Sequence, residues 1–97
     1  MYEILMEVHY ITKSGMRQTF LDAVAPYAAL SKAEEGNYGY DYYLNPNDDN
    51  DLLLIEKWQN QEILDKHFKM EHFTKIGEVK AKYVDDTNIT KHYVEIK

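Results

Sequence analysis

Hydrophobic and polar side chains alternate over residues 2–10 with the two-residue period of a half-buried β-strand. After a polar turn the period lengthens, and apolar residues recur at helical spacing from residue 16 to residue 30. This stretch predicts a helix, with Gly36 able to take the left-handed conformation that ends it. Because Pro26 removes one backbone hydrogen bond, we expect a kink or a break there.

The rest of the chain predicts two strands, a second helix and a last strand. Aromatic residues over 38–44 and an aliphatic run over 52–58 suit strands joined by a polar loop. Asn60 is a suitable N-cap for a helix whose apolar positions continue to Ile76, and we expect Gly77 to interrupt it. Alternation over residues 89–96 predicts the final strand.

This order of elements is that of an α+β, ferredoxin-like βαββαβ domain with an antiparallel sheet, and residues 1–97 suit a single domain. Two helices can cover only one face of a four-stranded sheet. Yet the third strand is apolar on both faces, and strand parity puts Tyr38, Tyr40 and Tyr42 on one face and Tyr43 on the other. We therefore expect a homodimer joined sheet to sheet.

Composition excludes several classes of protein. The absence of cysteine removes disulfides, thiolate catalysis and cysteine-bound clusters. A net charge of −6, with Arg17 the only arginine, argues against a nucleic-acid partner. No apolar run is long enough to cross a membrane, and a secretory signal does not normally contain acidic residues such as Glu3 and Glu7. We therefore expect a cytoplasmic protein with no membrane partner.

Neither of two candidate metal sites satisfies the usual requirements. The acidic loop after the second strand has EF-hand spacing, but Asn45 and Asn50 stand where that motif needs Asp and Gly, and both flanks read as strands. His67 and His72 are five residues apart, about 140° around a straight helix, so they cannot both face one ion without a distortion. Since His67 and Glu71 alone supply too few ligands, we expect no metal.

Three segments form a more specific pattern. They are the turn and strand over residues 34–40, the strand end over residues 54–58, and Leu64, His67, His72 and Phe73 in the second helix. The pattern resembles the antibiotic-biosynthesis-monooxygenase (ABM) family, and within it the small quinol-monooxygenase-like members. That family has a Glu-x-Gly-Cys turn, a Glu-x-Trp strand end, and a helical His followed five residues later by Pro-His or a similar pair. Asn37 stands here at the cysteine position.

The resemblance implies a dimeric α+β barrel with a pocket between helices and sheet. It also implies a monooxygenase without a cofactor, which acts on a small quinol or phenolic compound and dioxygen while the substrate supplies the electrons. Haem degradation is disfavoured, because Val8 or a neighbour, His67 and Gly77 stand where that branch has Asn, Trp and His. Two alternatives remain: an isomerase-like enzyme on the same scaffold, and a non-catalytic small-molecule-binding or stress-associated protein.

Candidate site residues follow from histidine chemistry and from the resemblance. Histidine has an unperturbed pKa of about 6.5, so it suits a base that forms a quinol anion near neutral pH. The resemblance places His67 and His72 near the pocket, and His67 shares its helix face with apolar neighbours, which makes it the first candidate. The expected substrate-binding side chains are aromatic: Trp58, Tyr40, Phe68 and Phe73. Trp58 has a competing interpretation, as a core anchor under the second helix.

Overall fold

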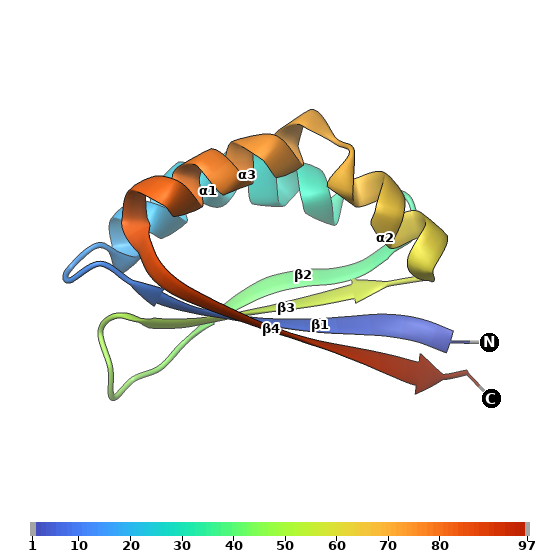
Figure 1. Ribbon diagram of the computed structural model, residues 1–97, viewed down its shortest axis with the longest axis horizontal. Coiled ribbons are helices and arrows are strands. Elements are labelled where there is room, and N and C mark those ends of the chain that lie inside the picture. The colour runs from blue at the N-terminus through green and yellow to red at the C-terminus, as the bar shows by residue number, and fades with distance from the viewer. Residues whose placement is uncertain (1, 97) are drawn as a thin grey trace.

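Three helices cover one face of a four-stranded antiparallel sheet in the computed structural model, which describes residues 2–96 (Figure 1). The strand order β2-β3-β1-β4 and the order of elements along the chain confirm the predicted ferredoxin-like α+β fold. The elements are β1 (Tyr2–Thr12), α1 (Arg17–Lys32), β2 (Asn37–Leu44), β3 (Asp51–Trp58), α2 (Gln61–Phe68), α3 (Glu71–Tyr83) and β4 (Val84–Glu95).

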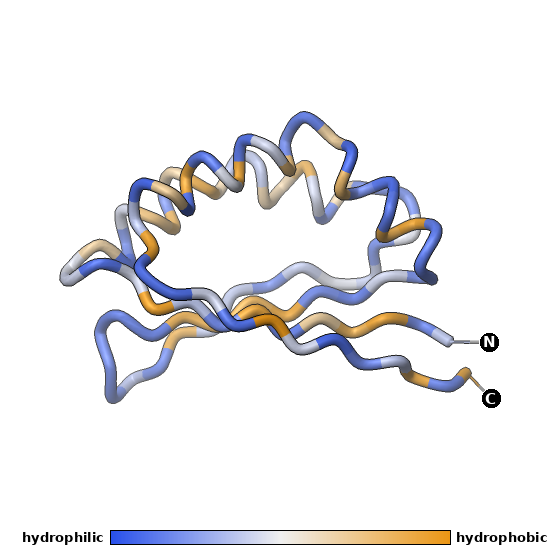
Figure 2. The backbone as a smooth tube through the Cα atoms, in the orientation of Figure 1, coloured by the Kyte–Doolittle hydropathy of each residue, from blue (hydrophilic) through white to orange (hydrophobic). Residues whose placement is uncertain are grey.

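Strand alternation builds the core between the sheet and the helices. Every second residue of β1, from Ile4 to Thr12, is buried under the helices, and the same holds for β3 from Leu52 to Trp58. The tube in Figure 2 is accordingly richest in hydrophobic residues along the central strands. Two polar residues interrupt these apolar rows. Thr12 lies at the end of β1, and Glu56 pairs with Met6 on one side and with Tyr40 on the other, so its carboxyl group lies in the core layer.

The helix boundaries differ from the sequence prediction at two places. α1 runs unbroken through Pro26, which lies on the exposed side, where water can reach the carbonyl group that loses its donor. The second helical segment is interrupted at Lys69 and Met70, where Met70 is extended, and not at Gly77, which lies inside α3. Gly36 does adopt a positive φ of 82°, but in the turn before β2, after α1 has already ended.

The last strand and the tyrosine strand also depart from expectation. β4 begins at Val84, earlier than residue 89, because backbone pairing with β1 extends over a polar stretch that shows no alternation. In β2 the register shifts between Asn37 and Gly39, so Tyr38 is exposed and does not pack beside Tyr40.

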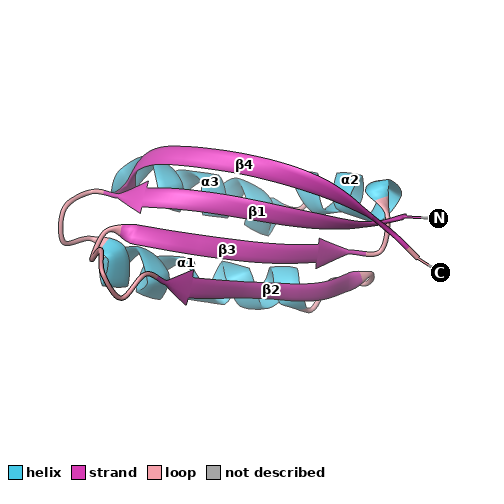
Figure 3. Ribbon diagram, turned by 90° about the horizontal axis from the view of Figure 1, so that it is seen from below, coloured by secondary structure: helices cyan, strands magenta, loops and turns pink. Residues whose placement is uncertain are grey.

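The other face of the sheet carries no helix among the described residues, as the view from below makes clear (Figure 3). Tyr43 lies on this open face, whereas Tyr40 and Tyr42 lie on the helix side, as strand parity predicted. Within residues 2–96, no helix is long and apolar enough to span a membrane.

Candidate functional site

A cavity of about 140 Å³ lies between the sheet and helices α2 and α3. Its walls are mainly apolar, and an apolar cavity of about this volume in another protein binds benzene, so the space suits one six-membered ring. Only a few side chains with polar groups line it, the usual composition of a small-molecule site: Tyr10, Tyr40, Glu56, His67 and Lys80.

His67 is held at this cavity by the local structure of α2. The side chain of Asn60 accepts a hydrogen bond from the backbone N–H of Ile63 (2.9 Å) and so begins the helix. Leu64 and His67 then share the buried face, and His67 is only 1% exposed. Its ring packs against the indole of Trp58, with 4.5 Å between the ring centroids. The imidazole is therefore fixed in an almost water-free position.

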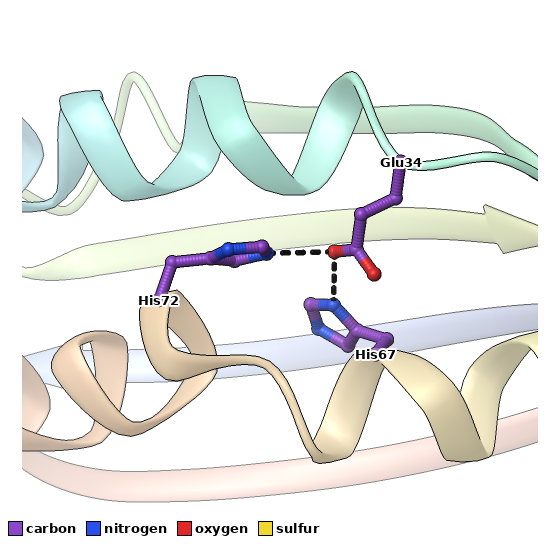
Figure 4. A group of neighbouring side chains, drawn as sticks. All are labelled: Glu34, His67 and His72. Atoms are coloured by element: carbon purple, nitrogen blue, oxygen red, sulfur yellow. Dashed lines mark hydrogen bonds and ion pairs between the residues drawn. The ribbon is translucent and has the colours of Figure 1, made fainter.

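A carboxylate from the turn between α1 and β2 orients the imidazole of His67. The Nδ1–H of His67 donates to Oε2 of Glu34 at 2.6 Å, and Nε2–H of His72 donates to the same oxygen at 2.8 Å (Figure 4). The two histidines can converge because the chain breaks between α2 and α3. The sequence indicated that they could converge only if the helix were distorted, and the break at Lys69 and Met70 is that distortion.

The same three side chains carry donor atoms of the kind that bind zinc. One carboxylate oxygen of Glu34 and one ring nitrogen each of His67 and His72 lie within 4.8 Å of one another. Hydrogen bonds already pair these atoms, with each imidazole donating to the carboxylate. We therefore interpret the three side chains as a hydrogen-bonded network. Because the ring proton of a neutral His67 is then on Nδ1, its Nε2 atom carries no proton and can accept one.

Glu56 supplies a second acid–base group next to His67. Its Oε1 accepts a hydrogen bond from the indole Nε1–H of Trp58 (3.1 Å) and lies 4.0 Å from Nε2 of His67. The pKa of Glu56 is raised to about 7, mainly by burial and also by the nearby Glu34 carboxylate, while the hydrogen bond from Trp58 and the charge of Lys80 oppose the shift. Burial also lowers the pKa of His67, against the effect of Glu34. Glu56 can therefore exchange protons near neutral pH, while the lowered pKa of His67 favours its neutral imidazole, which can accept a proton.

Comparison with known proteins identifies the family. The family model described as antibiotic biosynthesis monooxygenase matches residues 1–79. The chain belongs to the ABM family. This confirms the resemblance seen in the sequence segments.

One curated relative and two solved structures are similar to this ABM chain. It is 29% identical over 70 residues to the Bacillus subtilis (strain 168) protein named "Putative monooxygenase YcnE". The aligned region covers 72% of this chain and 74% of the relative. The crystal structure of PA3566 from Pseudomonas aeruginosa has a TM-score of 0.88 at 20% identity and covers 99% and 97% of the two chains. A conserved protein from Methanosarcina mazei Go1 has a TM-score of 0.89 at 23% identity, covering 98% and 95%. These two structures support the fold alone.

The residues predicted for the site separate into two groups. His67, Tyr40, Phe68 and Phe73 line the cavity of this ABM chain. Trp58 does not line it and is fully buried, as its interpretation as a core anchor requires. His72 lies behind Glu34 and is likewise no part of the lining.

Sequence reasoning missed Glu34 and Glu56 as candidate functional groups. Glu34 is the Glu of the ABM turn motif, so its position was visible but was given no role. Glu56 shares strand parity with Trp58, and its neighbours of the same parity, Leu52 and Leu54, are apolar. A carboxyl group in an inward-facing row is the signal that could have identified it.

Proposed function

We propose that this ABM-family chain is a monooxygenase that acts on a small quinol or phenolic compound, without a cofactor, and that the substrate provides the electrons for dioxygen. The observation that carries the proposal is the pairing of His67 and Glu56 in an apolar cavity sized for one ring. Such a space can hold a quinol with its hydroxyl group near Nε2 of His67. The ABM family membership and the name of the Bacillus subtilis relative support the reaction type.

The first step is proton transfer from a quinol hydroxyl group to Nε2 of His67. Glu34, on Nδ1–H, stabilises the imidazolium that forms, and the quinol anion gives up electrons to dioxygen far more readily than the neutral quinol. One oxygen atom is inserted into a ring C–H bond, and the other leaves as water with the two hydroxyl hydrogens. The product is a hydroxyquinone, and the four electrons lost by the ring reduce one dioxygen molecule.

The test is oxygen consumption by the purified protein with a panel of single-ring quinols. Replacing His67 with alanine is expected to lower turnover by about a hundredfold or more, the usual contribution of a general base, while binding is retained. His92→Ala is the matched control, because that histidine lies on the open sheet face with its side chain 45% exposed. Unchanged oxygen consumption in a folded His67→Ala protein would remove His67 from the mechanism.

A second candidate, a proton-transfer isomerase, is favoured by the 4.0 Å separation of His67 and Glu56. One group can remove a proton from a substrate carbon while the other returns a proton elsewhere, and no oxidant is needed. The two functions differ in their need for dioxygen. Turnover that continues under argon would support the isomerase, and turnover that stops would support the oxygenase.

A further inference from the structure

The cavity is lined by one lysine, Lys80, that forms no direct ion pair with a carboxylate of the described residues. Lys80 lines the cavity from α3 and is half-buried, with Nζ 5.2 Å from the centroid of the Tyr10 ring. No ion pair of Lys80 within 4.0 Å exists among residues 2–96. Glu56 faces the same cavity, but it accepts from Trp58 and lies beside His67 instead. The Glu56 carboxylate acts on the Lys80 ammonium group only at longer range, where it raises the pKa of Lys80 against the larger lowering by burial. An anion in direct contact with this half-buried ammonium group would therefore stabilise it further.

Lys80 and the pair His67 and Glu56 lie at opposite ends of the cavity, as their positions relative to β1 show. Met6 pairs with Glu56, whereas Tyr10, over which Lys80 lies, is four residues further along β1, about 13 Å at the rise of an extended strand. Val8 lies between these two positions and lines the apolar middle. The lining is therefore polar toward both ends, with His67 and Glu56 at one and Lys80 at the other.

Helix α3 has an exposed position without a side chain beside the lysine. Ile76, Gly77 and Lys80 line the cavity together, and a Cβ atom built on Gly77 would meet nothing within 4 Å. The rest of the molecule does not favour an anion, because the chain carries a net charge of −6. Although the protein as a whole is acidic, the ammonium group of Lys80 therefore provides a positive charge at the cavity.

We propose that the ligand of this cavity is a single aromatic or quinoid ring that carries a carboxylate group, and that Lys80 binds the carboxylate. The volume of about 140 Å³ accepts one ring with a small substituent and disfavours a fused polycyclic compound. A charge-assisted hydrogen bond from Nζ fixes the ring so that its other end lies toward His67 and Glu56. This inference rests on the proposed function, because it narrows the substrate class for the same cavity.

Binding of two matched probes tests the inference without requiring turnover. Benzoate and benzyl alcohol have the same ring and similar size, and neither is a quinol. Titration calorimetry, with NMR shifts to locate the site, is expected to show at least tenfold tighter binding of benzoate to the unmodified protein. Lys80→Met should abolish this preference and Lys80→Arg should keep it. Lys75→Met is the control, since Lys75 is on the same helix but pairs with Glu78 at 3.5 Å and does not line the cavity.

Three results would overturn the inference: equal affinities for the two probes, no benzoate binding at millimolar concentration, or a preference that persists in Lys80→Met. Oxygen uptake, measured separately with hydroquinone and 2,5-dihydroxybenzoate, distinguishes this failure from failure of the proposed function. A Lys80-dependent benzoate preference without any oxygen uptake keeps the inference and rejects the oxygenase. Oxygen uptake with hydroquinone, without a Lys80-dependent preference, keeps the oxygenase and rejects the inference.

Discussion

Glu56 is a carboxyl group held in the layer where the sheet meets the helices, and it is only 7% exposed. The single hydrogen bond from Trp58 satisfies one lone pair of the carboxyl group, which leaves its ionised form poorly solvated. Burial therefore dominates, and it raises the pKa of Glu56 to about 7. The ionised Glu56 carboxylate therefore lowers the stability of the folded protein. Its position beside His67 suits it to proton transfer.

The pKa of Glu56 predicts how stability changes with pH. Below about pH 4.5 the group is protonated in both the folded and the unfolded chain, so it carries no penalty. As pH rises from 4.5 to 7 the unfolded chain releases the proton while the folded chain retains it, and the free energy of unfolding falls. A difference of about 2.5 pKa units corresponds to about 3 kcal/mol above pH 7.

Glu56→Gln isolates this effect, because the amide oxygen can still accept the hydrogen bond from Trp58. Urea denaturation is expected to give the same free energy of unfolding for both proteins near pH 4, and about 3 kcal/mol more for the variant at pH 8. A difference that stays constant across this range would mean that Glu56 does not titrate with a raised pKa.

At this scale, the sequence allowed the cavity residues to be predicted only in part. Phe68 and Phe73 are five residues apart, as His67 and His72 are, and both reach the cavity because the helix breaks between α2 and α3, whereas Tyr40 could be placed inward from strand parity alone. The partners Glu34 and Glu56 could not, because their contacts depend on how α1, α2 and β3 come together. Periodicity within one element carries no information on such contacts between elements.

The break between α2 and α3 is the element-scale feature that forms the Glu34 network. No proline or glycine lies between His67 and His72, so intrinsic propensity alone predicts a continuous helix there. The break allows α3 to pack against α1 while α2 packs over the end of the sheet (Figure 1). Tertiary packing overrides local preference, which is why the sequence prediction put the interruption at the wrong residue.

The turn between α1 and β2 yields a prediction about Gly36. Its φ of 82° disfavours any side chain, and a built Cβ atom would lie 2.7 Å from Cγ2 of Ile63 on α2. Gly36→Ala combines backbone strain with overpacking and is expected to lower the free energy of unfolding by about 2–4 kcal/mol. Gly15→Ala is the control, since Gly15 has a similar φ of 74° but open space around it, and should lose only about 1–2 kcal/mol. Equal losses in urea denaturation would show that contact with Ile63 contributes nothing.

The whole molecule has a layer of helices on one side of the sheet and an uncovered surface on the other (Figure 3). Aliphatic side chains of the two central strands lie at the middle of the open face, among them Leu5, Leu53 and Ile55. Groups of both charge signs surround them, such as Glu7 and Lys57. A surface with an apolar centre and mixed charges at its edges can be complementary to a second copy of itself about a two-fold axis.

We therefore predict a homodimer joined through the open face, with sedimentation velocity at micromolar concentration giving twice the 11.5 kDa of one chain. Ile55→Arg should shift the equilibrium to the monomer, because two copies would bring a desolvated, unpaired charge to the centre of the interface. Leu30→Arg serves as the control, since Leu30 is an exposed apolar residue on α1, on the covered side of the sheet. It should leave the dimer intact. A monomer in the unmodified protein, or a dimer that survives Ile55→Arg in a folded chain, would mean that the open face is not the interface.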